Sequence, residues 1–167
     1  LVTTPFFMEY TFYADNHGGK LVPVPGKADF DLNVENFERA ITERTAAVIV
    51  NSPNNPTGFV YPEETLKSLA ELLEKKSAEF GRAIYLISDE PYRKVVFDGT
   101  KVPPLLPLYR NTVIVTSHSK DLSIPGERIG YITVHPEAED GERLTGALIL
   151  CTRILGFVNA PALMQRV

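Results

Sequence analysis

Short apolar runs alternate along the chain with longer stretches in which apolar and polar residues are mixed. A run that is apolar at nearly every position is typical of a β-strand buried on both faces. The pattern therefore predicts strands over residues 20–24, 46–50, 83–87, 112–116 and 129–134.

The mixed stretches predict helices over residues 34–42, 62–79 and about 138–154. Asn33 precedes the first of them and can cap it, because its side-chain oxygen can accept a free backbone N–H of the first turn. In the second, Pro62 fits the first helical turn and acidic residues follow it. An apolar stripe at helical spacing completes that prediction, with Leu66, Leu69, Leu72 and Leu73.

Buried strands that alternate with helices predict an α/β fold. We expect a three-layer α/β/α arrangement around a mostly parallel sheet, because helices must cover both faces of such a sheet. The length of 167 residues fits one domain. Ligands of these sheets bind in the crevice beyond the carboxyl ends of the strands, so polar residues there are the first candidates for a site.

Composition narrows the classes of partner. The net charge is −4, and no long run of Lys or Arg occurs, so we expect no nucleic-acid partner. No apolar run approaches the roughly 20 residues of a membrane span, so no membrane partner is expected. Cys151 is the only cysteine, which is compatible with a reducing cytoplasm, and its apolar neighbours predict a buried thiol.

Polar motifs follow three of the predicted strands. The run 46–50 leads into Asn51-Ser-Pro-Asn-Asn-Pro-Thr-Gly58, the run 83–87 into Ser88-Asp-Glu-Pro-Tyr92, and the run 112–116 into Ser117-His-Ser-Lys120. Alone, the first reads as a turn, the second as a helix cap and the third as a solvated lysine. Together they predict one crevice that receives an amide, a carboxylate with a phenol, and a lysine with hydroxyls.

The third motif resembles the lysine signature of the class I and II aminotransferases. In that signature a glycine and an arginine follow the lysine, as Gly126 and Arg128 follow Lys120 here. The turn 55–58 looks like the family's asparagine turn, and the segment 89–92 looks like its aspartate–tyrosine pair. The three motifs stand in the family's order, and the closest likeness is to aspartate-type and related broad-specificity members.

The resemblance implies pyridoxal 5'-phosphate as the cofactor and no metal. Lys120 would form the Schiff base with the cofactor aldehyde and then move a proton at the substrate α-carbon. Asp89 would pair with the protonated pyridine nitrogen. Tyr92 and Asn55 would donate hydrogen bonds to the cofactor's O3′.

The resemblance also implies a phosphate site. Arg128 would bind two phosphate oxygens through its guanidinium, and Ser117 and Ser119 would add hydroxyl donors. His118 stands where the family usually has an apolar or aromatic residue. We expect it to pack or to form a hydrogen bond rather than to act in catalysis.

Other charged residues near these motifs have no expected role. Arg93, Lys94, Asp121 and Glu127 are interpreted as solvated surface charges. This expectation treats them like most charged side chains, which are exposed unless they are paired.

Several parts of the family are not recognised in the sequence. They are a glycine-rich turn for the phosphate, an aromatic that stacks on the ring, which we expect before Leu1, and the small domain with its carboxylate-binding arginine. We therefore expect residues 1–167 to be a fragment of the large domain, without the family's N-terminal segment and C-terminal small domain. The full-length protein is expected to be a homodimer.

Three functions remain open from the sequence. The first is transfer of an amino group from an amino acid, with aspartate as the default and aromatic amino acids and alanine open, to a 2-oxo acid. The second is a lyase or synthase, such as a C–S lyase, that uses the same cofactor and fold. The third is a non-catalytic aminotransferase-like domain of a regulator.

Overall fold

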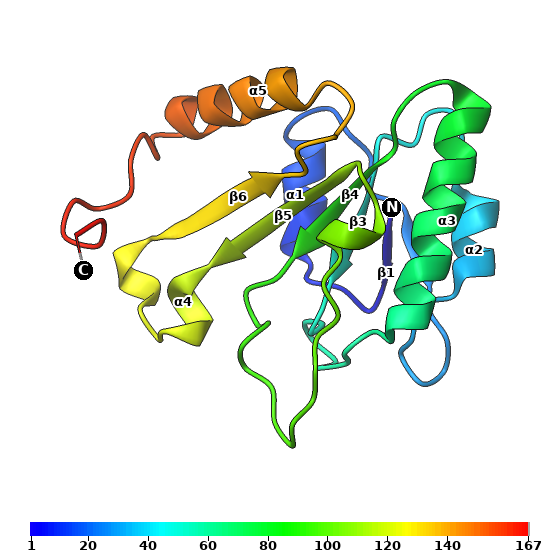
Figure 1. The fold of residues 1–167 in the computed structure, drawn as a ribbon, viewed down its shortest axis with the longest axis horizontal. Helices are drawn as coiled ribbons and strands as arrows, with labels where there is room; N and C mark the ends of the chain where they lie inside the picture. The colour runs from blue at the N-terminus through cyan, green and yellow to red at the C-terminus, as the bar shows by residue number, and fades with distance from the viewer. Residues whose placement is uncertain (167) are drawn as a thin grey trace.

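A six-stranded sheet organises the computed structural model, which describes residues 1–166 (Figure 1). The strands lie in the order β2-β1-β3-β4-β5-β6. All neighbouring pairs are parallel except β5 and β6, which are antiparallel. Their bounds are β1 Val2–Thr4, β2 Pro23–Pro25, β3 Ala47–Asn51, β4 Tyr85–Asp89, β5 Thr112–Ser117 and β6 Gly130–Val134. The predicted mostly parallel sheet is confirmed.

The strand predictions differ from the structure mainly at the ends. The predicted strand 83–87 is observed two residues later, as β4, and the predicted strand 20–24 is observed as the shorter β2. The strand β1 was not predicted, because three residues are too few to form a recognisable apolar run. The antiparallel direction of β6 follows from the short connection after β5, which returns the chain without a crossover helix.

Five helices accompany the sheet within residues 1–166: α1 Glu9–Asp15, α2 Val34–Ala40, α3 Glu63–Phe80, α4 His118–Asp121 and α5 Gly141–Ile154. Short 3-10 turns lie at Leu106–Leu108 and Pro125–Glu127. Asn33 caps α2 as predicted, since its side chain accepts the backbone N–H of Asn36 at 3.1 Å. Pro62 has extended backbone and stands just before α3 rather than in its first turn.

The core lies between one face of the sheet and the helices α2 and α3. The leucine stripe of α3 is buried there, as predicted, against side chains of β3 and β4 such as Val48, Val50 and Leu86. On the opposite face, Tyr10 of α1 and the preceding Phe7 line a cavity together with Ile49 and Ile87 of the sheet. The two sides together give the expected three layers (Figure 1).

The helix α5 buries none of its side chains. Cys151 is exposed there, so the expectation of a buried thiol was wrong. The apolar stretch around Cys151 does form a helix, but its large side chains, among them Ile149, Leu150 and Ile154, are uncovered. None of the helices in residues 1–166 has both the length and the apolar character to cross a membrane.

Candidate active site

The three motif-bearing strands end side by side at one edge of the sheet. The register pairs Asn51 of β3 with Asp89 of β4, and Asp89 with Val115 of β5. Because these strands are parallel, their carboxyl ends point the same way, and the motifs that follow them meet. The three motifs found in the sequence therefore belong to one region of the molecule.

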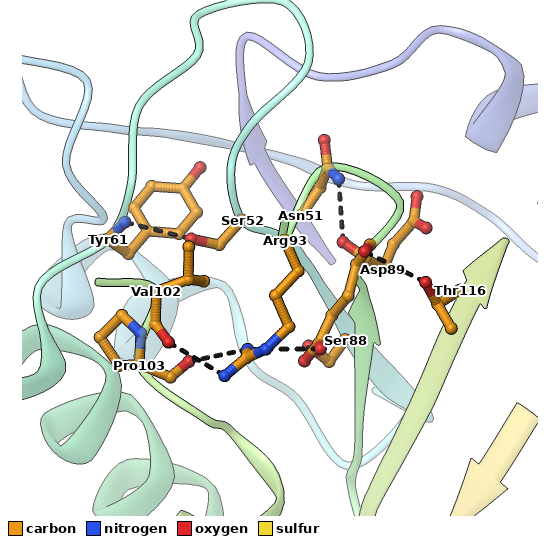
Figure 2. A network of polar contacts seen from close by, with 10 residues as sticks. Asn51, Ser52, Tyr61, Ser88, Asp89, Arg93, Val102, Pro103 and Thr116 are labelled. Carbon is orange, nitrogen blue, oxygen red and sulfur yellow. Dashed lines mark hydrogen bonds and ion pairs between the residues drawn. The ribbon is translucent and has the colours of Figure 1, made fainter. Parts of the chain in front are cut away.

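Hydrogen bonds between neighbouring strand ends fix this edge (Figure 2). Asn51 donates from its side-chain amide to the backbone carbonyl of Asp89 at 2.9 Å. Thr116 donates from its hydroxyl to the carbonyl of Glu90 at 3.1 Å. The backbone that carries Asp89 is thus held by side chains from the strands on both of its sides.

The asparagine turn is ordered by its own side chains. The backbone N–H of Asn55 donates to the side-chain oxygen of Asn51 at 2.6 Å, so Asn51 holds the turn as well as β4. Thr57 donates its hydroxyl to the side-chain oxygen of Asn54 at 2.9 Å. Gly58 closes the turn at a φ of 72°, in the left-handed region that favours glycine. Asn51 was not singled out from the sequence, although its place at the start of the motif marks the strand end.

Asn55, Tyr92 and Lys120 come together from three different motifs. The side-chain amide of Asn55 lies 3.5 Å from the phenol oxygen of Tyr92. The amine of Lys120 lies 5.9 Å from the centre of the Tyr92 ring. Lys120 is exposed, and no carboxylate of residues 1–166 forms an ion pair with it. The amine therefore lies near the ring of Tyr92, the amide of Asn55 lies near its hydroxyl, and the amine is accessible.

Asp89 is partly buried at the same strand end and accepts a hydrogen bond from the phenol of Tyr10. Burial raises the pKa of Asp89 above its usual range, while the bond from Tyr10 opposes that rise. Burial also raises the pKa of Tyr10, so the phenol keeps its proton and remains a donor. Tyr10 is a residue that the sequence analysis did not assign to the site.

A cavity opens next to this carboxylate. Phe7, Tyr10 and Asp89 line it together, with Ile87 and Val115 from the neighbouring strands. The chain therefore offers an aromatic ring beside Asp89 from within its own first residues.

A network of polar contacts around Ser88 and Arg93 holds the segment that follows Asp89 (Figure 2). Glu90 is buried and accepts from the hydroxyl of Ser88 at 2.7 Å and from Arg93 at 3.3 Å. Arg93 also donates to the carbonyls of Val102 and Pro103, at 2.9 and 3.3 Å. The expectation that Arg93 is a solvated charge was wrong, because a buried carboxylate two residues from Tyr92 requires a cationic partner.

The predicted phosphate ligands are only partly gathered. Ser117 ends β5 and Ser119 lies in the turn α4 that follows. Arg128 is exposed, has a φ of 50°, and donates to the carbonyl of Pro125 at 2.6 Å. Within residues 1–166, no hydrogen bond joins Arg128 to either serine.

Asp121 also departs from the sequence expectation. Its side chain is only 8% exposed and lies 3.3 Å from the amine of Lys94. The ring nitrogen Nδ1 of His118 lies 3.2 Å from both carboxylate oxygens of Asp121. His118 is thus a hydrogen-bonding residue, as expected, whereas Asp121 is not a solvated charge and Lys94 is paired. Glu127 forms no ion pair with the rest of residues 1–166.

Comparison with known proteins identifies the family. The family model "Aminotransferase class I and II" matches residues 1–166, which is nearly the whole chain. The chain belongs to the class I and II aminotransferases. In this family pyridoxal phosphate is the cofactor, so the gathered amine, phenol and carboxylate lie in a fold that uses that chemistry.

Relatives within the class I and II aminotransferases include aspartate-type enzymes. The chain is 38% identical over 133 residues to a probable aspartate/prephenate aminotransferase of Thermus aquaticus, and 36% identical over 137 residues to the aspartate aminotransferase of Bacillus subtilis. Each alignment covers 78% of this chain and 33% of the relative. The chain therefore spans about a third of the length of these curated relatives.

Solved aminotransferase structures match the fold closely. A crystal structure of an aminotransferase from Eubacterium rectale superposes with a TM-score of 0.95 and is 48% identical, over 98% of this chain and 42% of the other. An aspartate aminotransferase variant from Thermus thermophilus superposes with a TM-score of 0.78 at 33% identity, over 95% of this chain and 41% of the other. The sheet described above is thus the aminotransferase sheet, seen in part.

Proposed function

We propose that this chain is the cofactor-binding core of a pyridoxal-phosphate-dependent aminotransferase of the aspartate type. The observation that carries the proposal is the meeting of Lys120, Tyr92 and Asn55 at the strand edge that also bears Asp89. These four groups come from three separate segments of the chain. The proposal gives each of them one role on a single small ring.

The donor set fits the cofactor. Asp89 is a partly buried carboxylate, and no ion pair joins it to a cation in the part of the chain that the structure describes. A buried carboxylate is stabilised by a positive partner, and a protonated pyridine nitrogen is such a partner. Tyr92 and Asn55 offer donors for the ring hydroxyl oxygen, and the accessible amine of Lys120 suits an aldehyde.

The phosphate of the cofactor would be held at the start of α4 and by Arg128. Ser117 and Ser119 each supply a hydroxyl donor there. A guanidinium has five N–H donors, so the bond of Arg128 to Pro125 leaves others for phosphate oxygens. These contacts would anchor the cofactor at the end opposite to Asp89.

Bound pyridoxal phosphate supplies an electron sink for the negative charge that develops at the substrate α-carbon. Lys120 takes and returns the proton at that carbon, which requires its amine to be neutral. Tyr92 and Asn55 orient the ring through its hydroxyl oxygen. Asp89 keeps the ring nitrogen protonated, provided that its own carboxylate is ionised, and Tyr10 favours that ionised form.

We further propose that residues 1–167 are the central part of the large domain of a longer polypeptide. This proposal is supported by the alignments with the curated relatives, which cover 33% of each relative's length. Aspartate is proposed as the amino donor and a 2-oxo acid as the acceptor, because the names of the relatives point to them. A cytoplasmic homodimer is proposed for the full-length protein.

A covalent trap tests the role of Lys120. The full-length protein is mixed with pyridoxal phosphate, reduced with borohydride, digested and analysed by mass spectrometry. We expect the cofactor mass on the peptide that contains Lys120, and no such mass in Lys120→Ala. A label on another lysine, or none in the unchanged protein, would refute the proposal.

A product assay then distinguishes the reaction types. With aspartate and a 2-oxo acid, an aminotransferase yields a new amino acid and consumes both substrates in equal amounts. Release of ammonia or of a free thiol, without a new amino acid, would favour a lyase instead.

A further inference from the structure

We infer that Asp121 is a positioning residue for Lys120. Its carboxylate holds the turn that carries the lysine against the turn that carries Tyr92. This inference rests on the proposed function and extends it, because Asp121 acts through its neighbours and not on the cofactor.

Asp121 is placed and buried as a structural anchor would be. It directly follows Lys120 in the single turn of α4, and its side chain is 8% exposed. A buried carboxylate without partners is costly, and this one is satisfied by His118 at 3.2 Å and Lys94 at 3.3 Å. Both contacts are charge-assisted, so they weaken if the charge of Asp121 is removed.

The two partners connect different elements. Lys94 stands two residues after Tyr92, in the turn that follows β4. His118 begins α4, donates its backbone N–H to the carbonyl of Ile129 at 3.0 Å, and packs its ring 6.1 Å from that of Tyr131 in β6. Asp121 thus joins the turn after β4, the turn after β5 and the strand β6.

The position of the Lys120 amine relative to Tyr92 depends on how the turn after β5 is placed against the turn after β4. The amine of Lys120 stands 5.9 Å from the Tyr92 ring on a flexible and exposed side chain. Lys94–Asp121 is the ion pair that spans the two turns within residues 1–166. If that link is lost, the amine and the phenol keep their chemistry but lose their fixed separation, and small misplacements of reacting groups can cost large factors in rate.

The experiment measures how fast the cofactor-free full-length protein captures pyridoxal phosphate on its lysine, followed by stopped-flow absorbance. We expect Asp121→Asn to slow capture about tenfold or more, and Lys94→Met to slow it about two- to fivefold. The double variant should be no slower than Asp121→Asn, because both changes remove the same link. Lys94→Arg, which keeps the charge, should stay close to the unchanged protein.

Asp15→Asn is the matched control, because Asp15 is exposed at the end of α1 and forms no ion pair within residues 1–166. Thermal unfolding midpoints are recorded for every variant. Slower capture at an unchanged midpoint then reflects a displaced Lys120 and not partial unfolding. The inference is overturned if Asp121→Asn captures as fast as Asp15→Asn, or if the effects of Lys94→Met and Asp121→Asn simply add. Should Asp121→Asn fail to fold, the comparison of Lys94→Met with Lys94→Arg decides, and equal rates refute the link. Absence of capture by the unchanged protein would instead count against the proposed function.

Discussion

Single residues at the strand edge show what the sequence could and could not indicate. Lys120, Tyr92 and Asn55 were predicted because their motifs follow apolar runs and resemble those of the family, and the structure brings the three residues near one another. Tyr10 was missed because its partner Asp89 is 79 residues away, and no local pattern tells which strand end a helix will meet. Asp121 was misjudged because the burial of a charge depends on partners from other segments.

Tyr10→Phe should weaken cofactor binding and change its dependence on pH. The ring nitrogen needs an ionised Asp89, so affinity falls as the pH drops through the pKa of that carboxyl. Burial already raises this pKa and the phenol opposes the rise, so without the phenol the fall begins at a higher pH. At neutral pH we expect affinity to drop about tenfold, the order of a hydrogen bond to a charged group.

The measurement is a titration of each protein with pyridoxal phosphate, by absorbance, across a pH series. Tyr13→Phe is the matched control, since that exposed phenol donates to Glu9 on the same helix and not to Asp89. Identical pH curves for the two variants would remove Tyr10 from the site.

Helices and strands were predicted better in type than in direction. The leucine stripe of α3 and the cap of α2 were both readable, because each depends on neighbours along the chain. The antiparallel return of β6 was not, because pairing direction is set by the length of the connection and by what the paired strands bury. Gly130 is where this return is tightest, since a Cβ there would collide with the backbone carbonyl of Thr116.

Gly130→Ala should therefore push β6 away from the end of β5. Ser117 pairs with Gly130, so the displacement would move the predicted phosphate ligand and the turn behind it. We expect a loss of about 1–3 kcal/mol in stability, as for other overpacked positions, together with weaker cofactor binding. Denaturant titration and cofactor titration measure the two effects.

Gly146→Ala provides the comparison within a helix. A Cβ at Gly146 meets nothing within 4 Å, and alanine favours a helix over glycine by about 1 kcal/mol. This variant should be equal to the unchanged protein or more stable, with unchanged cofactor binding. If both alanine variants behave alike, the close approach at Gly130 has no part in the site.

The whole chain leaves apolar surface uncovered. Along α5 the exposed side chains include Ile149, Leu150 and Ile154, and on α1 Phe12 is exposed as well. Apolar side chains that are exposed next to one another, as on α5, mark places where other protein segments pack. The sequence predicted the three layers but could not indicate how completely they would be covered, because apolar runs alone do not show which of their faces meets another element.

Residues 1–167 expressed alone should associate with increasing concentration. Ile149→Lys combined with Ile154→Lys should reduce that association, because the charges make contact between apolar helix faces unfavourable. Light scattering over a concentration series measures it. Lys substitutions at the exposed Glu137 and Glu142, which leave the apolar face intact, serve as the control. Equal association of both double variants would show that the apolar face of α5 is not the surface through which the copies associate.

Within residues 1–166, Arg93 holds the loop beyond Tyr92 by hydrogen bonds to the main-chain oxygens of Val102 and Pro103. Every amino acid has a main-chain carbonyl oxygen, so these hydrogen bonds do not depend on which side chains the loop carries. The exposed Phe97, which lies between Arg93 and Val102, can therefore change while the phenol of Tyr92 stays in place. Phe97 lines a cavity together with Asn55 and Tyr92, so a substitution at Phe97 changes the wall of that cavity and leaves the hydrogen bonds of Arg93 intact.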